Sequence, residues 1–232
     1  MPARILLALD TPDVATAIAR TRAVGDAIDG IKLGLEFFVA NGPAGVRSVR
    51  QEGRPLFLDL KLHDIPNTVA GAVRSVVSLK PLLLTVHAGG GPKMLRAAAE
   101  AAATGGSARP LVIAVTVMTS LDDDDLVTIG QTPPVSDQVR RLAALSLAQG
   151  CDGVVCSAHE IATLRHDCGP DFKLVVPGLR SASGDQADQK RVMTPREAAH
   201  LGADFLIIGR PIARASDPAA AARQIRQEIT AP

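Results

Sequence analysis

One short stretch of the chain carries charged residues at a spacing that suits catalysis. Asp59, Lys61 and Asp64 follow the pattern Asp-x-Lys-x-x-Asp inside an apolar run. Because successive side chains of a strand point to opposite faces, we expect Asp59 and Lys61 on one face and Asp64 near the strand's carboxyl end. A structural ion pair is the alternative, but desolvation offsets much of the stability of a buried pair. The spacing therefore predicts a catalytic ammonium group held between two carboxylates.

Lys32 is a second lysine inside an apolar run, residues 30–34. An unpaired ammonium in a buried strand is costly, so Lys32 should have a carboxylate partner. The alternative is a residue at the rim of the fold whose ammonium reaches solvent. We favour an alternating Lys-Asp-Lys-Asp array, in which Lys32 is followed by Asp59, Lys61 and Asp64.

The elements that must position these residues are eight short apolar runs separated by helical patterns. The runs cover residues 5–9, 30–34, 55–61, 82–87, 111–117, 153–156, 173–176 and 205–208. Near-continuous aliphatic strands are typical of a parallel sheet covered on both faces. Eight βα units predict an α/β fold, a single-domain (β/α)8 TIM barrel over residues 1–232. The alternative, an open doubly wound sheet, would require a glycine-rich fingerprint where the chain has Asp10-Thr11-Pro12.

A barrel of this kind carries its active site at the carboxyl ends of its strands. Several polar residues fall at or just past those ends, and the fold would bring them around one mouth. They are Asp10, Lys32, Asp59, Lys61, Asp64, His87 and Thr119. The residue pattern leaves two interpretations of His87 open, a general base and a hydrogen-bonded histidine of the mouth.

The segments after the seventh and eighth runs suit a phosphate group, which barrels commonly bind there. Gly209 would permit close approach of the backbone, and Arg210 would offer a bidentate donor. A surface ion pair is the alternative for Arg210. The polar segment 177–191 could close as a lid that brings Arg180 and Gln189 to the phosphate, or be a disordered excursion.

The composition argues against several other classes of function. The formal net charge is +1, and the chain has five Phe but no Trp or Tyr, which argues against nucleic-acid binding. No apolar run is long enough for a membrane span, and the first residues lack the layout of a signal peptide. The three cysteines fit no metal or redox spacing, so we expect reduced, mostly buried thiols in a cytoplasmic protein and no metal site.

The chain resembles the orotidine 5′-phosphate decarboxylase family over essentially its whole length. The most specific match is the run from Asp59 to Thr68, Asp-Leu-Lys-Leu-His-Asp-Ile-Pro-Asn-Thr. Further matches are residues 8–10, 32–34, 86–90, 115–120, 177–180, 188–191 and 208–211. The resemblance implies decarboxylation of orotidine 5′-phosphate (OMP) to UMP in de novo pyrimidine biosynthesis, by a homodimer that uses no metal and no organic cofactor.

The resemblance also implies roles for the matching residues. The catalytic array would be Lys32, Asp59, Lys61 and Asp64, with Lys61 stabilising and then protonating a carbanion at C6 of the pyrimidine. The substrate-binding residues would be Asp10 and Lys32 at the ribose, Asp59 at the substrate carboxylate, Thr119 in the nucleotide pocket, and Arg180, Gln189, Gly209 and Arg210 at the phosphate. Asp64 and Thr68 would reach the site of the neighbouring subunit.

Two alternatives of function remain open. Related sugar-phosphate decarboxylases and hexulose-phosphate synthases share Asp-x-Lys-x-x-Asp, but they use Mg²⁺ and typically have an acidic residue where this chain has Lys32. A non-catalytic nucleotide-binding barrel would bind UMP without releasing CO2. Activity that persists in EDTA would argue against the Mg²⁺-dependent enzymes. Release of CO2 would argue against the non-catalytic nucleotide-binding barrel.

Overall fold

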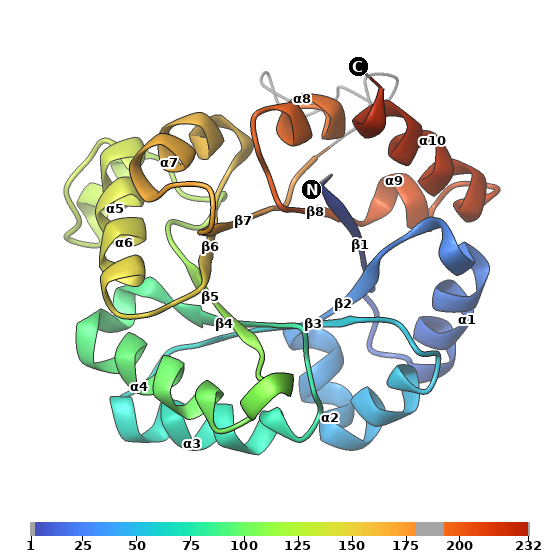
Figure 1. The fold of residues 1–232 in the computed structure, drawn as a ribbon, viewed down its shortest axis with the longest axis horizontal. Coiled ribbons are helices and arrows are strands. Elements are labelled where there is room, and N and C mark those ends of the chain that lie inside the picture. Colours follow the sequence, from blue (N-terminus) through green and yellow to red (C-terminus); the bar gives the residue numbers. More distant parts are fainter. Residues whose placement is uncertain (1–2, 180–192, 232) are drawn as a thin grey trace.

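The chain forms a closed barrel of eight parallel strands surrounded by helices (Figure 1). This computed structural model describes residues 3–179 and 193–231. The strands are paired in sequence order, and β8 returns to β1 to close the barrel. They are β1 (Arg4–Ala8), β2 (Gly30–Gly34), β3 (Leu56–Leu62), β4 (Leu83–His87), β5 (Leu111–Val115), β6 (Gly153–Val155), β7 (Lys173–Val176) and β8 (Phe205–Ile208). The predicted single-domain (β/α)8 barrel is confirmed, and the doubly wound alternative is wrong.

The helices form an outer ring around the barrel, as Figure 1 shows. They are α1 (Val14–Val24), α2 (Leu35–Arg50), α3 (Pro66–Val77), α4 (Gly91–Ala103), α5 (Asp123–Thr128), α6 (Val135–Ala148), α7 (Ile161–Cys168), α8 (Pro195–His200), α9 (Arg210–Ala213) and α10 (Pro218–Thr230). Short 3₁₀ turns are η1 (Gly25–Ala27), η2 (Ala88–Gly90), η3 (Gly106–Ala108) and η4 (Ala158–Glu160). Side-chain caps fix where several helices begin: Asp13 caps α1, and Asp122 with Asp125 forms a capping box at α5.

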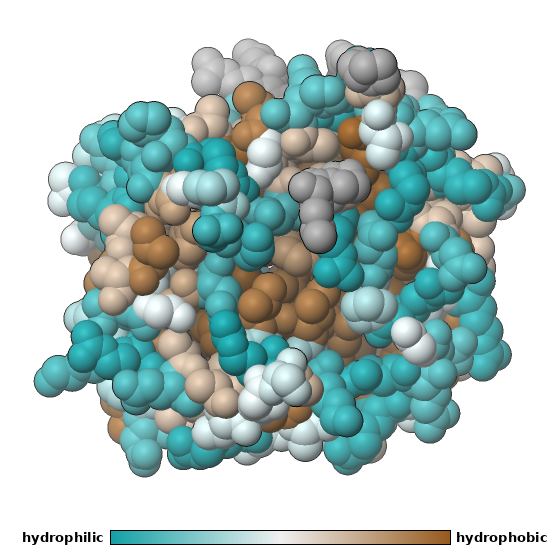
Figure 2. Space-filling view, in the orientation of Figure 1, coloured by the Kyte–Doolittle hydropathy of each residue, from teal (hydrophilic) through white to brown (hydrophobic). Residues whose placement is uncertain are grey.

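Each strand divides its side chains between two apolar layers. In β1, Ile5 and Leu7 belong to the large core between sheet and helices, whereas Leu6 and Ala8 belong to a separate cluster inside the barrel. This alternation is the period of two expected for a strand. Figure 2 shows the result on one face, where hydrophilic residues cover the ring of helices and hydrophobic residues line the hollow centre.

The same alternation directs charged side chains toward the inside of the barrel. Ile31 and Leu33 pack outward against the helices, so Lys32 between them must point inward. Leu58 and Leu60 likewise pack outward, which leaves Asp59 on the inner face of β3. The apolar residues of these strands therefore position the charges of the barrel mouth.

β3 departs from regular strand geometry at its carboxyl end. Leu58 pairs with Leu84 and Leu62 with Val86, so the three residues 59–61 stand opposite Thr85 alone. Lys61 has a φ of 49°, in the left-handed region that side chains other than glycine rarely adopt. The predicted strand is confirmed over Leu56–Leu62, and this irregularity within it re-aims the lysine, as β-bulges beside active sites commonly do.

Candidate active site

A pocket of about 1030 Å³ lies at the carboxyl ends of the strands. Seven of the residues predicted from the sequence line it: Asp10, Lys32, Asp59, Lys61, Thr119, Gly209 and Arg210. They come from five separate segments between β1 and α9. The remaining wall is largely aliphatic. Strands β5 to β8 contribute one residue each, Val115, Val155, Val175 and Ile207. The pocket thus has a charged side, formed by β1 to β3, and an apolar side.

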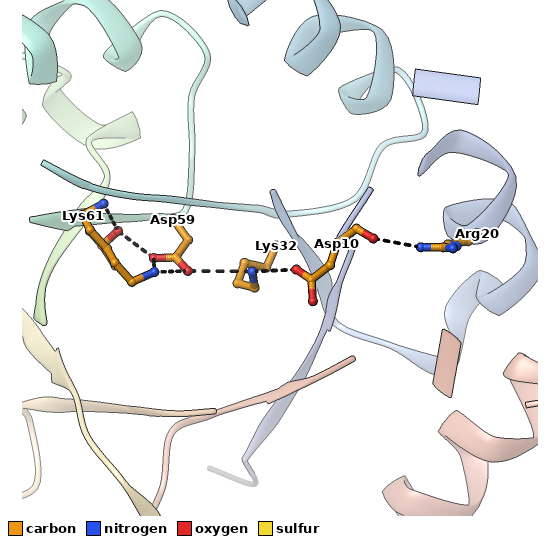
Figure 3. A network of polar contacts seen from close by, with 6 residues as sticks. Asp10, Arg20, Lys32, Asp59 and Lys61 are labelled. Carbon is orange, nitrogen blue, oxygen red and sulfur yellow. Dashed lines mark hydrogen bonds and ion pairs between the residues drawn. The ribbon is translucent and has the colours of Figure 1, made fainter. Parts of the chain in front are cut away.

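Four charges alternate along the charged side of the pocket (Figure 3). Lys32 Nζ lies 3.3 Å from Asp10 Oδ1 and 3.7 Å from Asp59 Oδ2. Lys61 Nζ donates to both carboxylate oxygens of Asp59, each at 2.8 Å. The structure thus brings Lys32, Asp59 and Lys61 together as predicted. Within one chain the fourth charge is supplied by Asp10 at the Lys32 end, and not by Asp64.

Burial decides how these charges interact. The side chains of Lys32 and Asp59 are 13% and 12% exposed, and that of Lys61 is 33% exposed. Lys32 is therefore not a rim residue that extends into solvent, and the array is the interpretation that the structure supports. Buried charges of one sign require partners of the other, and the alternation provides them along the whole row.

Thr85 is a site residue that the sequence analysis missed. Its hydroxyl donates to Asp59 Oδ1 at 2.9 Å and accepts the backbone N–H of Lys61 at 2.9 Å. In the sequence Thr85 stands in an aliphatic run, where a β-branched threonine is an ordinary strand former. The sequence does hold one indication of this role, because Thr85 stands two residues before His87 and so shares its face of the strand. A fully buried hydroxyl on that face needs polar partners.

Cationic side chains lie at the mouth beside the Asp10 end of the charged side, because β8 pairs with β1. Arg210 was predicted in a loop, but it is the first residue of the short helix α9. Its guanidinium is exposed and makes no ion pair with the described residues, so the predicted alternative of a surface ion pair gains no support. A Cβ built at Gly209 would lie 3.5 Å from Ala8 Cβ and 3.7 Å from Asp10 Oδ2, so a side chain there would project into the pocket. Arg214, which the sequence analysis did not select, also lines the mouth.

Four predicted residues lie away from this pocket or cannot be placed. Asp64 and Thr68 are exposed after β3 and do not line the pocket of their own chain. The carboxylate of Asp64 accepts the backbone N–H of Ile65 at 2.6 Å. Arg180 and Gln189, with residues 180–191 of the predicted lid, fall outside the described residues.

His87 does not line the pocket, and its contacts favour the second of its two interpretations. Its Nδ1 accepts the N–H of Gly89 at 3.3 Å, and its ring stacks on that of His63 with centroids 5.1 Å apart. Burial, with smaller contributions from His63 and Lys61, lowers the pKa of His87 below its usual value. We therefore interpret His87 as a neutral histidine that orders the start of η2.

The arrangement of potential metal ligands and of the cysteine thiols can be described for most of the chain. Over residues 3–179 and 193–231, no three or more His, Cys, Asp or Glu side chains gather where they could hold a metal ion. Burial raises the pKa of Cys151 to about 12 and raises that of Cys156 as well, which disfavours the thiolate form of both. None of the described helices has the length and apolar character needed to span a bilayer.

Fold and site together define a (β/α)8 barrel with a charged pocket at its carboxyl-terminal mouth. The sequence profile of the orotidine 5′-phosphate decarboxylase / HUMPS family matches residues 3–225. The chain is 56% identical to orotidine 5′-phosphate decarboxylase of Rhodospirillum rubrum, over 97% of this chain and 93% of the relative. It is 52% identical to that of Paramagnetospirillum magneticum, over 97% of both chains. The chain therefore belongs to this family, and the expectation of a carboxy-lyase is confirmed.

Solved structures agree with this relationship. The crystal structure of orotidine 5′-phosphate decarboxylase from Lactobacillus acidophilus superposes with a TM-score of 0.89, at 35% identity, over 99% of this chain and 100% of that one. The corresponding enzyme from Pyrococcus horikoshii has a TM-score of 0.80 at 26% identity, over 98% of this chain and 100% of that one. The barrel described above is thus the fold of both proteins.

Proposed function

We propose that this protein decarboxylates orotidine 5′-phosphate to UMP in pyrimidine biosynthesis, without a metal ion. The bond from C6 of the pyrimidine to the carboxylate carbon breaks, CO2 leaves, and the electron pair stays on C6. The Lys61 ammonium stabilises this carbanion and then transfers a proton to C6. The observation that carries the proposal is the row Asp10–Lys32–Asp59–Lys61, which presents a fixed ammonium to the pocket. Charge held in place before the reaction is usually the largest contribution to catalysis.

Asp59 and Lys32 support the proposed proton donor. Asp59 binds the Lys61 ammonium through both carboxylate oxygens, which fixes the direction in which the N–H bonds point. Lys32 contacts the same carboxylate from the other side and balances its charge. We assign Asp59 the role of aiming Lys61, and we place the carboxylate of the substrate beside Asp59.

The rest of the pocket suits a nucleotide. Asp10 and Lys32 would hold the ribose hydroxyls, Thr119 would line the nucleotide pocket, and Gly209 and Arg210 would bind the phosphate. The aliphatic wall formed by β5 to β8 offers a surface for the flat pyrimidine ring. Arg180 and Gln189 remain predicted phosphate ligands.

We also propose that two copies of the chain share their active sites. Asp64 and Thr68 would then complete the site of the partner subunit. Support comes from apolar side chains exposed after the two adjacent strands β2 and β3: Ile65, which follows Asp64, is 67% exposed, and Leu35 and Val39, which follow β2, are 49% and 81% exposed. Exposed apolar side chains at one edge of a protein often mark an interface. The proposal makes this edge self-complementary, as a two-fold dimer requires.

The proposed function is tested by following the loss of OMP absorbance with purified protein in EDTA. We expect turnover at an undiminished rate, because the charges are supplied by side chains and not by a metal ion. A rate restored only by Mg²⁺ would favour the related sugar-phosphate barrels, with which this family shares its sequence profile. Tight UMP binding without CO2 release would favour the non-catalytic alternative.

Arg210→Ala should chiefly weaken ligands that carry a phosphate. A charge-assisted phosphate contact contributes about 1.5–3 kcal/mol, so KM for OMP should rise roughly 10- to 150-fold. Orotidine, which lacks the phosphate, should lose little. The matched control is Arg223→Ala, which removes an exposed arginine from α10 on the outer ring of helices. Equal losses for OMP and orotidine would remove Arg210 from the phosphate site.

A further inference from the structure

Thr85 is buried on β4, next to the Asp59–Lys61 end of the charged side, and the proposed mechanism gives it no role. Its side chain is completely buried on the inner face of β4, between Leu84 and Val86, which pack outward. A hydroxyl group removed from water is unfavourable unless it has hydrogen-bond partners. The partners of Thr85 are two residues of the proposed catalytic row.

The direction of both hydrogen bonds follows from the chemistry of the groups. A carboxylate has no proton to give, so the Thr85 hydroxyl must donate to Asp59 Oδ1 at 2.9 Å. A backbone N–H can only donate, so the same oxygen accepts from Lys61 N at 2.9 Å. One hydroxyl therefore holds the carboxylate of Asp59 and the backbone of Lys61 at the same time.

The irregularity of β3 explains why a side chain is needed at this point. Asp59, Leu60 and Lys61 stand opposite Thr85 alone, so the parallel ladder is interrupted between the flanking pairs. The Thr85 hydroxyl takes the N–H of Lys61, while Lys61 adopts its left-handed conformation with a φ of 49°. A lysine keeps such a conformation only where its surroundings hold it there.

We propose that Thr85 is a positioning residue, whose hydroxyl holds Lys61 in the left-handed conformation that directs its ammonium to Asp59 and the pocket. The proposal deepens the proposed function and rests on it for the role of Lys61. In this arrangement Asp59 is held by Thr85 through Oδ1 and by Lys61 through both oxygens. Loss of the hydroxyl frees the backbone and the carboxylate together.

Two substitutions separate the hydroxyl from the shape of the side chain. Thr85→Val keeps the branched shape and removes both hydrogen bonds, whereas Thr85→Ser keeps the hydroxyl and removes a methyl group. We expect Thr85→Val to lower kcat about 10- to 100-fold, because small misplacements of a reacting group cost this much. KM for OMP should change little, since the proposed ribose and phosphate contacts lie elsewhere. Thr85→Ser should stay within about threefold of the wild-type kcat, since its hydroxyl can make both bonds.

The matched control is Thr21→Val in α1. Thr21 is also buried and donates a single hydrogen bond to Ala17 O at 2.8 Å, away from the pocket. It should lower the unfolding temperature without changing kcat. If Thr85→Val and Thr85→Ser had equal kcat values, or if Thr21→Val lowered kcat as much as Thr85→Val, the positioning role would be wrong. If Thr85→Val does not fold, Thr85→Ala removes the same two bonds with a smaller side chain and is judged by the same comparison.

A second measurement is independent of turnover. In the wild-type protein the Lys61 amide should exchange with deuterium as slowly as the paired amides of β3, because Thr85 holds it. Rapid exchange at Lys61 would overturn the proposal. If the wild-type protein failed to decarboxylate OMP but its Lys61 amide exchanged slowly, the proposed function would be wrong. The hydrogen bond from Lys61 to Thr85 would still be supported.

Discussion

Lys61→Ala is expected to lower kcat for OMP by at least about 10³-fold, on the scale of a deleted transition-state donor. The variant loses both the stabilising charge and the proton donor, whereas the proposed ribose and phosphate contacts remain. UMP should therefore still bind with near-normal affinity. The measurements are OMP turnover under saturation and calorimetric titration with UMP.

The chain provides an unusually close control for this variant. Lys80 also adopts a left-handed conformation, with a φ of 48°, but it is exposed outside the pocket. Lys80→Ala therefore repeats the loss of a lysine side chain from the same kind of backbone without touching the site. Its kcat should match the wild type. A near-normal kcat for Lys61→Ala would mean that Lys61 is structural and that the proposed mechanism is wrong.

Mixing two nearly inactive variants is expected to restore activity to about a quarter of the wild-type value. If Asp64 serves the partner's site, each site combines Lys61 of one chain with Asp64 of the other. Lys61→Ala and Asp64→Ala chains that are unfolded, mixed and refolded should give about half mixed dimers. In each mixed dimer one site carries both substitutions and the other carries none, so about one site in four is native.

The outcome of this experiment distinguishes the two possible origins of Asp64. If Asp64 acted in the site of its own chain, every site would carry one substitution and no activity would return. The control is refolding of each variant alone, which should stay inactive. Mass spectrometry must confirm that mixed dimers have formed. Their presence without restored activity would contradict the shared site.

The fold could be predicted because burial on both faces leaves a clear pattern in each strand. The run 205–208, for example, contains only Phe, Leu and Ile, and it forms β8. Short elements leave less trace: α8 has six residues and α9 has four, too few for a helical period to emerge. This is why Arg210 was expected in a loop.

The composition of the site could be predicted, but its local geometry could not. The pairing of Asp59 with Lys61 followed from their spacing. Its geometry, however, depends on the left-handed backbone conformation of Lys61 and on an interruption in the pairing of β3 with β4, and the residue types predict neither. The contact of Asp10 with Lys32 needs the closed barrel, because it joins side chains of separate strand ends. The role of Thr85 could not be predicted because its hydrogen-bond partners belong to the neighbouring strand β3.

The alternation of charge along the site has a consequence for how substrate is captured. The charges of two carboxylates and two ammonium groups cancel, so the row from Asp10 to Lys61 has no net charge. Its electrostatic field is therefore strong only at short range. Arg210 and Arg214 at the mouth add positive charge that no ion pair within the described part of the chain balances. Under the proposed function, long-range attraction of the phosphorylated substrate, and its screening by salt, would come from these arginines, and the row would act only after contact. The proposed function thus assigns substrate encounter and bond breaking to two different groups of charges in one pocket.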